Sequence, residues 1–271
     1  MGNRNGKLAE RRAVDSNEDN ITTTDEAFVP AQTPVKSNLP ISVTLRQQVN
    51  VKTPYALQFI WDCIKIGNAL VFPDNNNYQL IICNSDGKHR IPLPCNPYYI
   101  TEVNGSVSSK ISTICSCWGI SCIDNNLYVV IEWFMIHVIE VTGKVKRTIL
   151  LPSNIIRHIT VDRDRLVCID YTSIYCCSLD GTLIWKFKNY NYQDLRGVTT
   201  DGEGYVYVNN GNTNSVVEVF GDGQNHREIL TGSDGLNRPR GIYFDKKENI
   251  LLVCNYRDGK AFLFDVNKEL T

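Results

Sequence analysis

From about residue 43 to the end of the chain, short runs of β-branched and aromatic residues alternate with short polar stretches. Clear examples of the apolar runs are 127–131, 165–169, 205–208 and 250–254. The stretches between them are rich in Asp, Asn and Gly, which favour turns. Strands of about five residues at a spacing of about ten are typical of a β-sandwich, a β-barrel or a β-propeller. The pattern therefore predicts an all-β domain.

An internal repeat distinguishes these three architectures. In each aligned segment an Arg is followed five residues later by an Asp that opens a turn. The aligned segments are 154–162, 193–201 and 237–245. Trp118 fills the position of the Arg one repeat earlier, and the successive spacings from Trp118 to Arg240 are 39, 39 and 44 residues. A repeat of about 40 residues that holds four strands indicates one blade of a β-propeller.

The repeat also predicts the number of blades. Tyr98 fits the same position again but lies only 20 residues before Trp118, so the second blade lacks the residues for its two middle strands. The runs 100–106 and 107–113 are its expected first and last strands. The last repeat supplies three strands, and we expect the strand 43–50 to add the fourth and close the ring. The prediction is a six-bladed β-propeller with an incomplete second blade and an N-terminal strand that closes the last blade.

Composition divides the chain into two parts. Residues 1–40 are rich in Asn, Thr, Asp and Glu and have no periodic apolar residues, which predicts a disordered leader. Residues 41–271 form the predicted propeller. The chain has neither an N-terminal apolar export signal nor an apolar run of about 20 residues, so we expect a cytoplasmic protein without a membrane partner. In that compartment the ten cysteines are expected to be reduced.

Several motifs in the repeats match a known family. They are YCCSLDG at 175–181, WKF at 185–187, LRGV at 195–198, GYVYV at 204–208, DGL at 234–236, LLVCN at 251–255 and KAFLF at 260–264. With these motifs the chain resembles the C-terminal NHL-repeat propeller of tripartite-motif proteins, a TolB-like fold, over roughly residues 43–271. The resemblance implies a domain that captures the protein substrates of ubiquitin ligases or, in some members, RNA. The zinc-binding ligase modules of that family are not expected in this chain, because residues 1–40 contain no Cys/His zinc spacing.

The candidate binding residues are the five that occupy the equivalent repeat position, Tyr98, Trp118, Arg157, Arg196 and Arg240. Each precedes the innermost strand of its blade, so propeller symmetry predicts that they meet at one rim of the central channel. Arg and aromatic side chains are enriched among the residues that dominate binding energy. We therefore predict that this rim binds a protein or peptide. The alternative is structural: each Arg stacks on the neighbouring blade or pairs with an acidic side chain in a loop.

Nothing in the sequence predicts a catalytic residue, a metal site or a cofactor. The four histidines, His89, His137, His158 and His226, fall at non-equivalent positions of the repeat. The aspartates that recur in the repeats open turns, where they are expected to cap their own backbone. They are Asp124, Asp162, Asp201 and Asp245. The favoured function is therefore that of a protein-interaction propeller that is not an enzyme.

Two alternative functions stay open. The first is an RNA-binding NHL propeller, although residues 41–271 carry 23 Lys and Arg against 23 Asp and Glu and so have no overall basic charge. The second is a six-bladed propeller hydrolase or lactonase, in which channel carboxylates would hold calcium. The Arg, Trp and Tyr residues predicted at the rim do not favour a bound cation.

Overall fold

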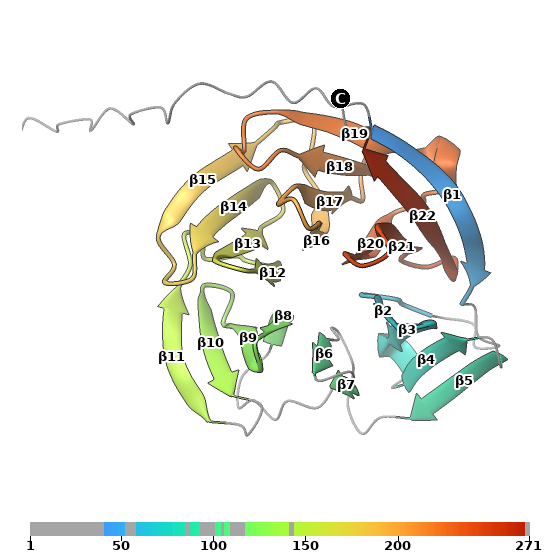
Figure 1. The fold of residues 1–271 in the computed structure, drawn as a ribbon, viewed down its shortest axis with the longest axis horizontal. Coiled ribbons are helices and arrows are strands. Elements are labelled where there is room, and N and C mark those ends of the chain that lie inside the picture. The colour runs from blue at the N-terminus through green and yellow to red at the C-terminus, as the bar shows by residue number, and fades with distance from the viewer. Residues whose placement is uncertain are drawn as a thin grey trace, which may run out of the picture. The chain divides into compact units, whose positions relative to one another are not determined.

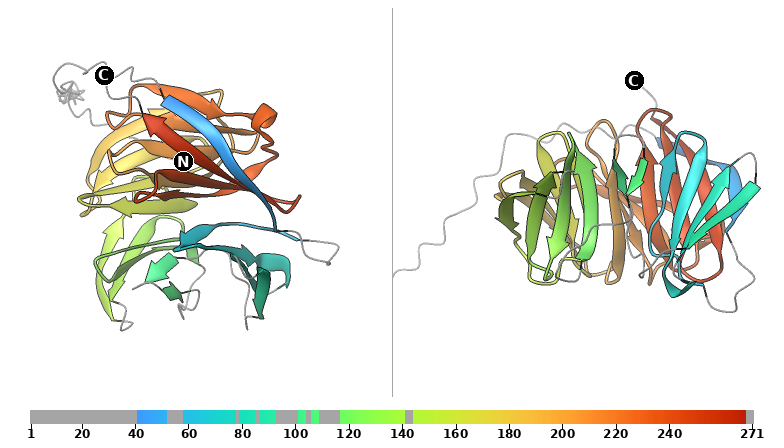
Figure 2. Two further views of the ribbon diagram at one scale, coloured as in Figure 1. Left: turned by 45° about the vertical axis from the view of Figure 1, so that its right-hand side comes forward. Right: turned by 90° about the horizontal axis from the view of Figure 1, so that it is seen from below.

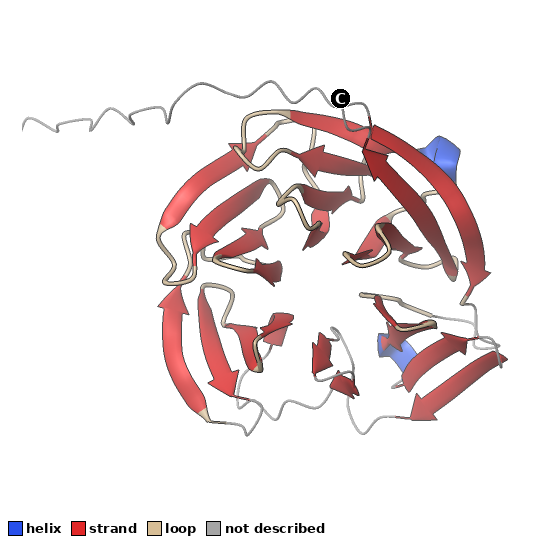
Figure 3. Ribbon diagram, viewed as in Figure 1, coloured by secondary structure: helices blue, strands red, loops and turns tan. Residues whose placement is uncertain are grey.

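Most strands are short, largely apolar runs joined by Asp-, Asn- and Gly-containing turns, as the sequence pattern predicts. A computed structural model describes residues 41–51, 58–77, 79–84, 87–92, 101–103, 106–108, 117–140 and 144–268. The predicted leader, residues 1–40, lies outside these ranges. The described residues belong to one compact unit built almost entirely of strands (Figure 3). The two short 3₁₀ helices are η1 (Asn75–Asn77) and η2 (Gly232–Asp234).

The strands form five four-stranded antiparallel sheets that surround a central channel like the blades of a propeller (Figures 1 and 2). The first blade is β2 (Ile64–Ile66), β3 (Ala69–Asp74), β4 (Gln79–Asn84) and β5 (Gly87–Pro92). The next is β8 (Cys117–Ile123), β9 (Asn126–Ile131), β10 (Met135–Glu140) and β11 (Val145–Leu150). It is followed by β12 (His158–Asp162), β13 (Arg165–Ile169), β14 (Ser173–Ser178) and β15 (Leu183–Lys188). Then come β16 (Leu195–Thr200), β17 (Val206–Asn210), β18 (Ser215–Val219) and β19 (His226–Leu230). The prediction of an all-β propeller is confirmed.

The predicted number of six blades is wrong, because the described residues form five. In place of the second blade, β6 (Thr101–Val103) and β7 (Ser106–Ser108) form a two-stranded antiparallel sheet. The chain between Pro92 and Cys117 is much shorter than the ~40 residues that a blade requires. The prediction placed the first strand at 100–106 and the last at 107–113; β6 lies within the first range, β7 begins at Ser106 rather than at 107, and residues 109–113 lie outside the described residues.

The N-terminal strand closes the ring, as predicted. The last blade consists of β20 (Pro239–Asp245), β21 (Ile250–Asn255), β22 (Lys260–Lys268) and, at its outer edge, β1 (Ile41–Asn50). Strand β1 runs antiparallel to β22 from the pair Ile41–Lys268 to the pair Asn50–Lys260. It begins two residues before the predicted start at residue 43. The two ends of the propeller chain are thus held together by an antiparallel ladder that is interrupted by one irregularity between Leu45 and Gln47.

The core lies between neighbouring blades rather than within one sheet. One apolar cluster joins Val138 and Tyr128 of blade β8–β11 to Ile159 and Leu166 of blade β12–β15. Burial of one such Leu or Ile side chain stabilises the fold by about 1.5–3 kcal/mol relative to its exposure. Three further clusters of similar size lie at the other well-formed blade junctions. Cohesion of the ring therefore depends on contacts between residues about one repeat apart.

Polar contacts reinforce the same junctions at the innermost strands. The Ser121 hydroxyl accepts a hydrogen bond from the amide of Val161 (3.0 Å), one repeat further along the chain. The Thr199 hydroxyl accepts the equivalent bond from Phe244 (3.2 Å). The inner strands also approach closely at Gly197, where an added Cβ atom would lie 2.5 Å from the carbonyl oxygen of Arg240. A residue with a side chain could not be accommodated there without a shift of the backbone.

Candidate functional site

The start of every inner strand lies on one face of the propeller. Because consecutive strands of a blade are antiparallel, the turn between the second and third strands and the link to the next blade lie on this face as well. We call it the rim face. The turns between the first and second strands lie on the other face, which we call the opposite face. The candidate binding residues that the structure describes lie at or near the starts of the inner strands and therefore belong to the rim face.

The structure places three of the five predicted binding residues together on the rim face. Arg157 directly precedes β12, whereas Arg196 and Arg240 are the second residues of β16 and β20. All three side chains are partly buried. Trp118 lies near the start of β8, and Tyr98 lies outside the described residues.

Two of these arginines contact a shared aromatic ring. The guanidinium carbon of Arg157 lies 4.0 Å from the ring centre of Trp133 and 4.2 Å from that of Tyr171. The guanidinium of Arg196 lies 5.3 Å from the same Tyr171 ring, and its Nη2 atom is 2.5 Å from Oδ1 of Asp194. Trp133 and Tyr171 belong to the turns between the second and third strands of two adjacent blades. We call Trp133, Arg157, Tyr171 and Arg196 the first ladder.

A second ladder lies where the last blade meets the first. The guanidinium of Arg240 is 3.3 Å from the ring centre of Trp61 and 4.8 Å from that of Tyr256. Arg257 lies 5.2 Å from the ring of Tyr256 and 5.4 Å from that of Phe59, and these two rings stack at 5.1 Å. Phe59 and Trp61 precede β2, whereas Arg240, Tyr256 and Arg257 belong to the last blade. We call these five residues the second ladder.

These contacts match the structural alternative for the three predicted arginines, in which each Arg packs against a neighbouring blade or pairs with an acidic side chain. Cation–π contacts between partly buried groups contribute about 0.5–2 kcal/mol each. The aromatic partners were not predicted, because they lie in turns rather than at the repeat position itself. A signal for them does exist in the sequence: Trp133, Tyr171 and Tyr256 each follow their repeat residue by 14 to 16 positions.

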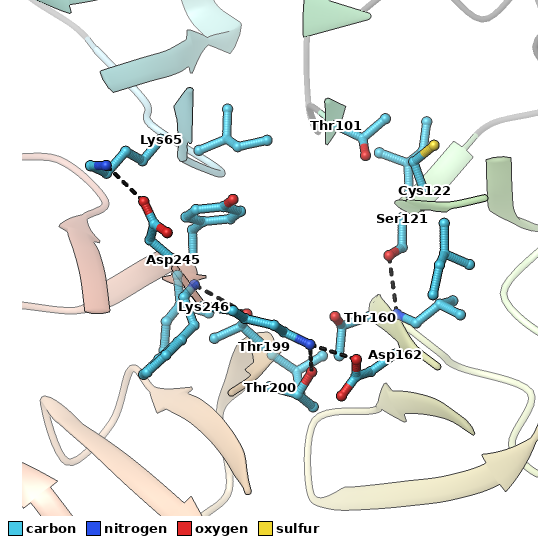
Figure 4. A pocket seen from close by; sticks show the side chains of 18 of the residues that line it. Lys65, Thr101, Ser121, Cys122, Thr160, Asp162, Thr199, Thr200, Asp245 and Lys246 are labelled. Atoms are coloured by element: carbon cyan, nitrogen blue, oxygen red, sulfur yellow. Dashed lines mark hydrogen bonds and ion pairs between the residues drawn. The ribbon is translucent and has the colours of Figure 1, made fainter. Parts of the chain in front are cut away.

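The inner strands enclose a cavity of about 860 Å³ in the channel (Figure 4). In five successive inner strands, the residue at the same position of the repeat carries a hydroxyl group on its side chain. The residues are Thr101, Ser121, Thr160, Thr199 and Tyr243, and all of them line the cavity. The hydroxyls of Ser121 and Thr199 already accept amide hydrogen bonds from the next blade. This set of hydroxyl groups therefore makes the cavity wall polar, and two of its members already hold neighbouring inner strands together.

At the opposite face, three equivalent turn aspartates bind lysine side chains from other blades. Asp162 lies 2.6 Å from the ammonium group of Lys246, which crosses from the last blade (Figure 4). Asp245 lies 2.7 Å from Lys65 of the first blade (Figure 4), and Asp201 pairs with Lys268 at the end of β22. Two of the carboxylates also fulfil the predicted turn role. Oδ1 of Asp201 accepts the amides of Glu203, Gly204 and Tyr205, and Oδ1 of Asp245 accepts those of Lys247 and Glu248.

The Lys65 ion pairs shift the pKa values of their members. Burial alone would raise the pKa of Asp245, but hydrogen bonds from Lys65 and from two backbone amides outweigh it, so the pKa is lowered. The hydrogen bond from Lys65 likewise lowers the pKa of Glu248. Burial would lower the pKa of Lys65, and its bonds to Asp245 and Glu248 reverse this and raise it. All three groups are therefore held in their charged forms at neutral pH.

Comparisons with solved structures show the same architecture. The WD40 propeller domain of Doa1 superposes with a TM-score of 0.59 at 9% identity, over 82% of this chain and 96% of that domain. The β-propeller domain of Cps50 (Swd1) from Myceliophteria thermophila gives 0.53 at 13% identity, over 78% and 84%. The chain is a β-propeller.

The remaining comparisons do not assign a family to this propeller. A streptogramin B lyase structure covers 77% of the chain at 17% identity, but with a TM-score of only 0.43, and the match spans 65% of the lyase. No model of a known protein family matches the chain, and no curated protein matches it in sequence. The solved structures show the fold alone, and the resemblance to tripartite-motif propellers stays a prediction.

Seven described cysteines are free thiols, and burial raises the pKa of Cys63 and of Cys168, so both are held as neutral thiols. Within the described ranges, no group of three or more His, Cys, Asp or Glu side chains is arranged to hold a metal ion. The same part of the chain contains no helix long and apolar enough to span a membrane.

Proposed function

We propose that this propeller is a protein-interaction platform that captures its partner on the rim face and is not itself an enzyme. The observation that supports this most directly is the alignment of Arg157, Arg196 and Arg240, from three successive blades, against aromatic rings on one face. Arg and large aromatic residues dominate the energy of protein interfaces. Side chains that are already held in place lose less conformational entropy when a partner binds. The ladders thus combine a structural role with a surface suited to binding.

The geometry of the ladders favours a protein partner over RNA. Readers of single-stranded RNA stack the bases on open aromatic faces. In the rim face, the ring of Tyr171 already contacts two guanidinium groups, and that of Trp61 contacts Arg240 at 3.3 Å. Bases would have to displace these contacts. The equal numbers of acidic and basic residues in 41–271 support the same choice.

The channel does not favour the hydrolase alternative. A propeller lactonase would need channel carboxylates directed at a bound cation. Asp162 and Asp245 line the cavity, and their carboxylates instead pair with lysine ammonium groups. Their negative charge is therefore offset within the fold. On this proposal the cavity is a structural consequence of the ring, and the finer role of substrate recognition rests on the resemblance to tripartite-motif propellers.

Site-specific photo-crosslinking tests the capture face. A photoreactive phenylalanine analogue replaces Tyr190, which is 81% exposed in the rim-face link between β15 and β16. The matched control carries the analogue at Lys247, an exposed position on the opposite face. In cells, crosslinked proteins should form from position 190, should not form from position 247, and should diminish when Arg196 and Arg240 are replaced by Ala in a folded protein. Crosslinks confined to position 247, or unaffected by the arginine substitutions, would place the partner elsewhere.

A further inference from the structure

The rim face presents more basic than acidic side chains to solvent. Its exposed cations in the described ranges are Lys188, Arg238, Arg257 and Lys260. The exposed acids on its described links and turns are Glu132 and Asp234. Asp234 is also engaged in capping η2, where its carboxylate accepts the amide of Thr231 at 2.8 Å. Among the described residues, the exposed side chains of this face are therefore mostly basic, although the propeller as a whole is not.

The other acids of the rim face are directed into the fold. Asp170 is buried and accepts hydrogen bonds from the amides of Thr172 and Ser173 (2.8 Å each) and from the hydroxyl of Tyr175 (2.8 Å). Asp194 is buried against Arg196. The carboxylate of Asp258 accepts hydrogen bonds from Asn255 and from the amide of Lys260. Because these groups serve the turns, they cannot act as docking points for a basic partner without disrupting the turns.

The ladders hold the guanidinium groups close to aromatic rings, with the guanidinium carbons 3.3–5.4 Å from the ring centres. A guanidinium is a planar group whose N–H donors form a fixed fork. Donors in this fork arrangement match the two oxygens of a carboxylate and form charge-assisted bonds that are stronger than neutral ones. The second ladder carries two such groups, Arg240 and Arg257, on the single ring of Tyr256.

The arginines of the ladders come from three successive blades, so a ligand that contacts all of them has to extend along the rim. Building on the proposed function, we infer that the partner binds this face through an acidic peptide segment in extended conformation. Its carboxylates pair with the ladder arginines and with Arg238. Attraction between opposite charges at the edge of an interface chiefly accelerates association and depends on salt. Binding should therefore weaken as the ionic strength rises and the charges are screened.

Selection from a random displayed peptide library on the full chain tests this inference without a known partner. We expect the selected peptides to be enriched in Asp and Glu. Their affinity, measured by fluorescence anisotropy, should fall about tenfold or more in R238E/R257E, equivalent to about 1.4 kcal/mol. The matched control is K144E/K247E, which makes the same change in net charge at two exposed positions of the opposite face. The control should retain binding within about twofold, and the melting temperatures of both variants establish that they are folded.

The outcomes separate this inference from the proposed function. Selected peptides that are neutral or basic, yet lose binding in R238E/R257E, would overturn the acidic partner and leave the rim face as the capture site. Peptides that bind equally well to R238E/R257E would overturn both. An equal loss in the two charge-reversal variants would show attraction to net charge alone and would overturn the inference. A selection that yields no binding peptide would also overturn it, because it requires that a short segment is sufficient.

Discussion

At the scale of single residues, the rim arginines show how one side chain can serve the fold and a binding surface together. The guanidinium of Arg240 lies against Trp61, which belongs to the segment that leads into the first blade. It therefore links the last blade to the first at the closure of the ring. Arg238, only two residues away, is exposed. The two arginines should consequently respond differently to the same substitution.

Arg240→Ala should lower the free energy of unfolding by about 1–2 kcal/mol, because it removes both a close cation–π contact and the packing of the aliphatic stem. Arg238→Ala should change it by less than about 0.5 kcal/mol, as is usual for exposed positions. Urea denaturation of both variants beside the wild type measures the difference. Equal midpoints for the two variants would show that the Trp61 contact contributes nothing to stability.

Lys65→Met should destabilise the propeller by about 3 kcal/mol at neutral pH, because removal of one partner leaves the carboxylate of Asp245 largely buried without its counter-ion. The loss should depend on pH. The pKa of Asp245 is lowered in the folded protein, so its contribution is complete above the ordinary value of about 3.9 and is lost as the pH falls through the lowered one. The stability difference between wild type and variant should therefore shrink in acid.

Denaturation curves measured from neutral to acidic pH check this dependence. Lys247→Met is the matched control, since Lys247 is an exposed neighbour on the same turn. The control should follow the wild type throughout the range. A difference between wild type and Lys65→Met that stays constant down to the most acidic pH would assign the loss to packing rather than to the ion pairs.

At the scale of elements, β1 is the strand that closes the ring. It is remote in sequence from β22, yet it supplies the outer edge of the last blade over its whole length. Ile41 and Val43 also pack against the core between the last two blades. Without β1, the edge of β22 would expose its unpaired backbone groups and this apolar surface to solvent.

Removal of residues 1–52 should therefore broaden the unfolding transition and lower its midpoint, whereas removal of residues 1–38 should leave it close to that of the full chain. Thermal unfolding followed by circular dichroism measures both truncations. If the shorter protein melts like the full chain, the β1–β22 ladder is not what holds the ring closed. If the protein that lacks residues 1–38 also melts early, a segment before β1 contributes to stability.

At the scale of the whole molecule, the apolar contacts between blades are unevenly distributed around the ring. The clusters at the well-formed junctions contain 11 or 12 buried residues. The sheets β2–β5 and β8–β11 each have one side that faces away from those junctions. The described apolar clusters on these two sides contain only three and four buried residues. A repeat protein gains much of its stability from the interfaces between neighbouring units. The two blades beside the β6–β7 hairpin should therefore be the least stable part of the propeller.

Native-state hydrogen exchange should detect this difference. The amides of β3 and β9 should exchange through local opening at a lower free energy than those of β13, β17 and β21, because local stability follows the amount of buried apolar contact. Mass spectrometry of peptic fragments gives the comparison. Uniform protection of all five strands would mean that the hairpin supports its neighbours as well as a full blade does.

Short apolar runs, turn residues and their spacing were sufficient to predict the all-β class, the repeat of about 40 residues, the closing role of the N-terminal strand and the common face of Arg157, Arg196 and Arg240. These features follow from local composition and from distances along the chain, which one sequence displays directly. The three-dimensional arrangement was needed to show that the short repeat contains a two-stranded sheet and that the described residues form five four-stranded blades. It alone also revealed that Trp61, Trp133, Tyr171 and Tyr256 contact the arginines. These outcomes depend on how neighbouring blades and their turns pack against one another, which spacing along the chain does not show.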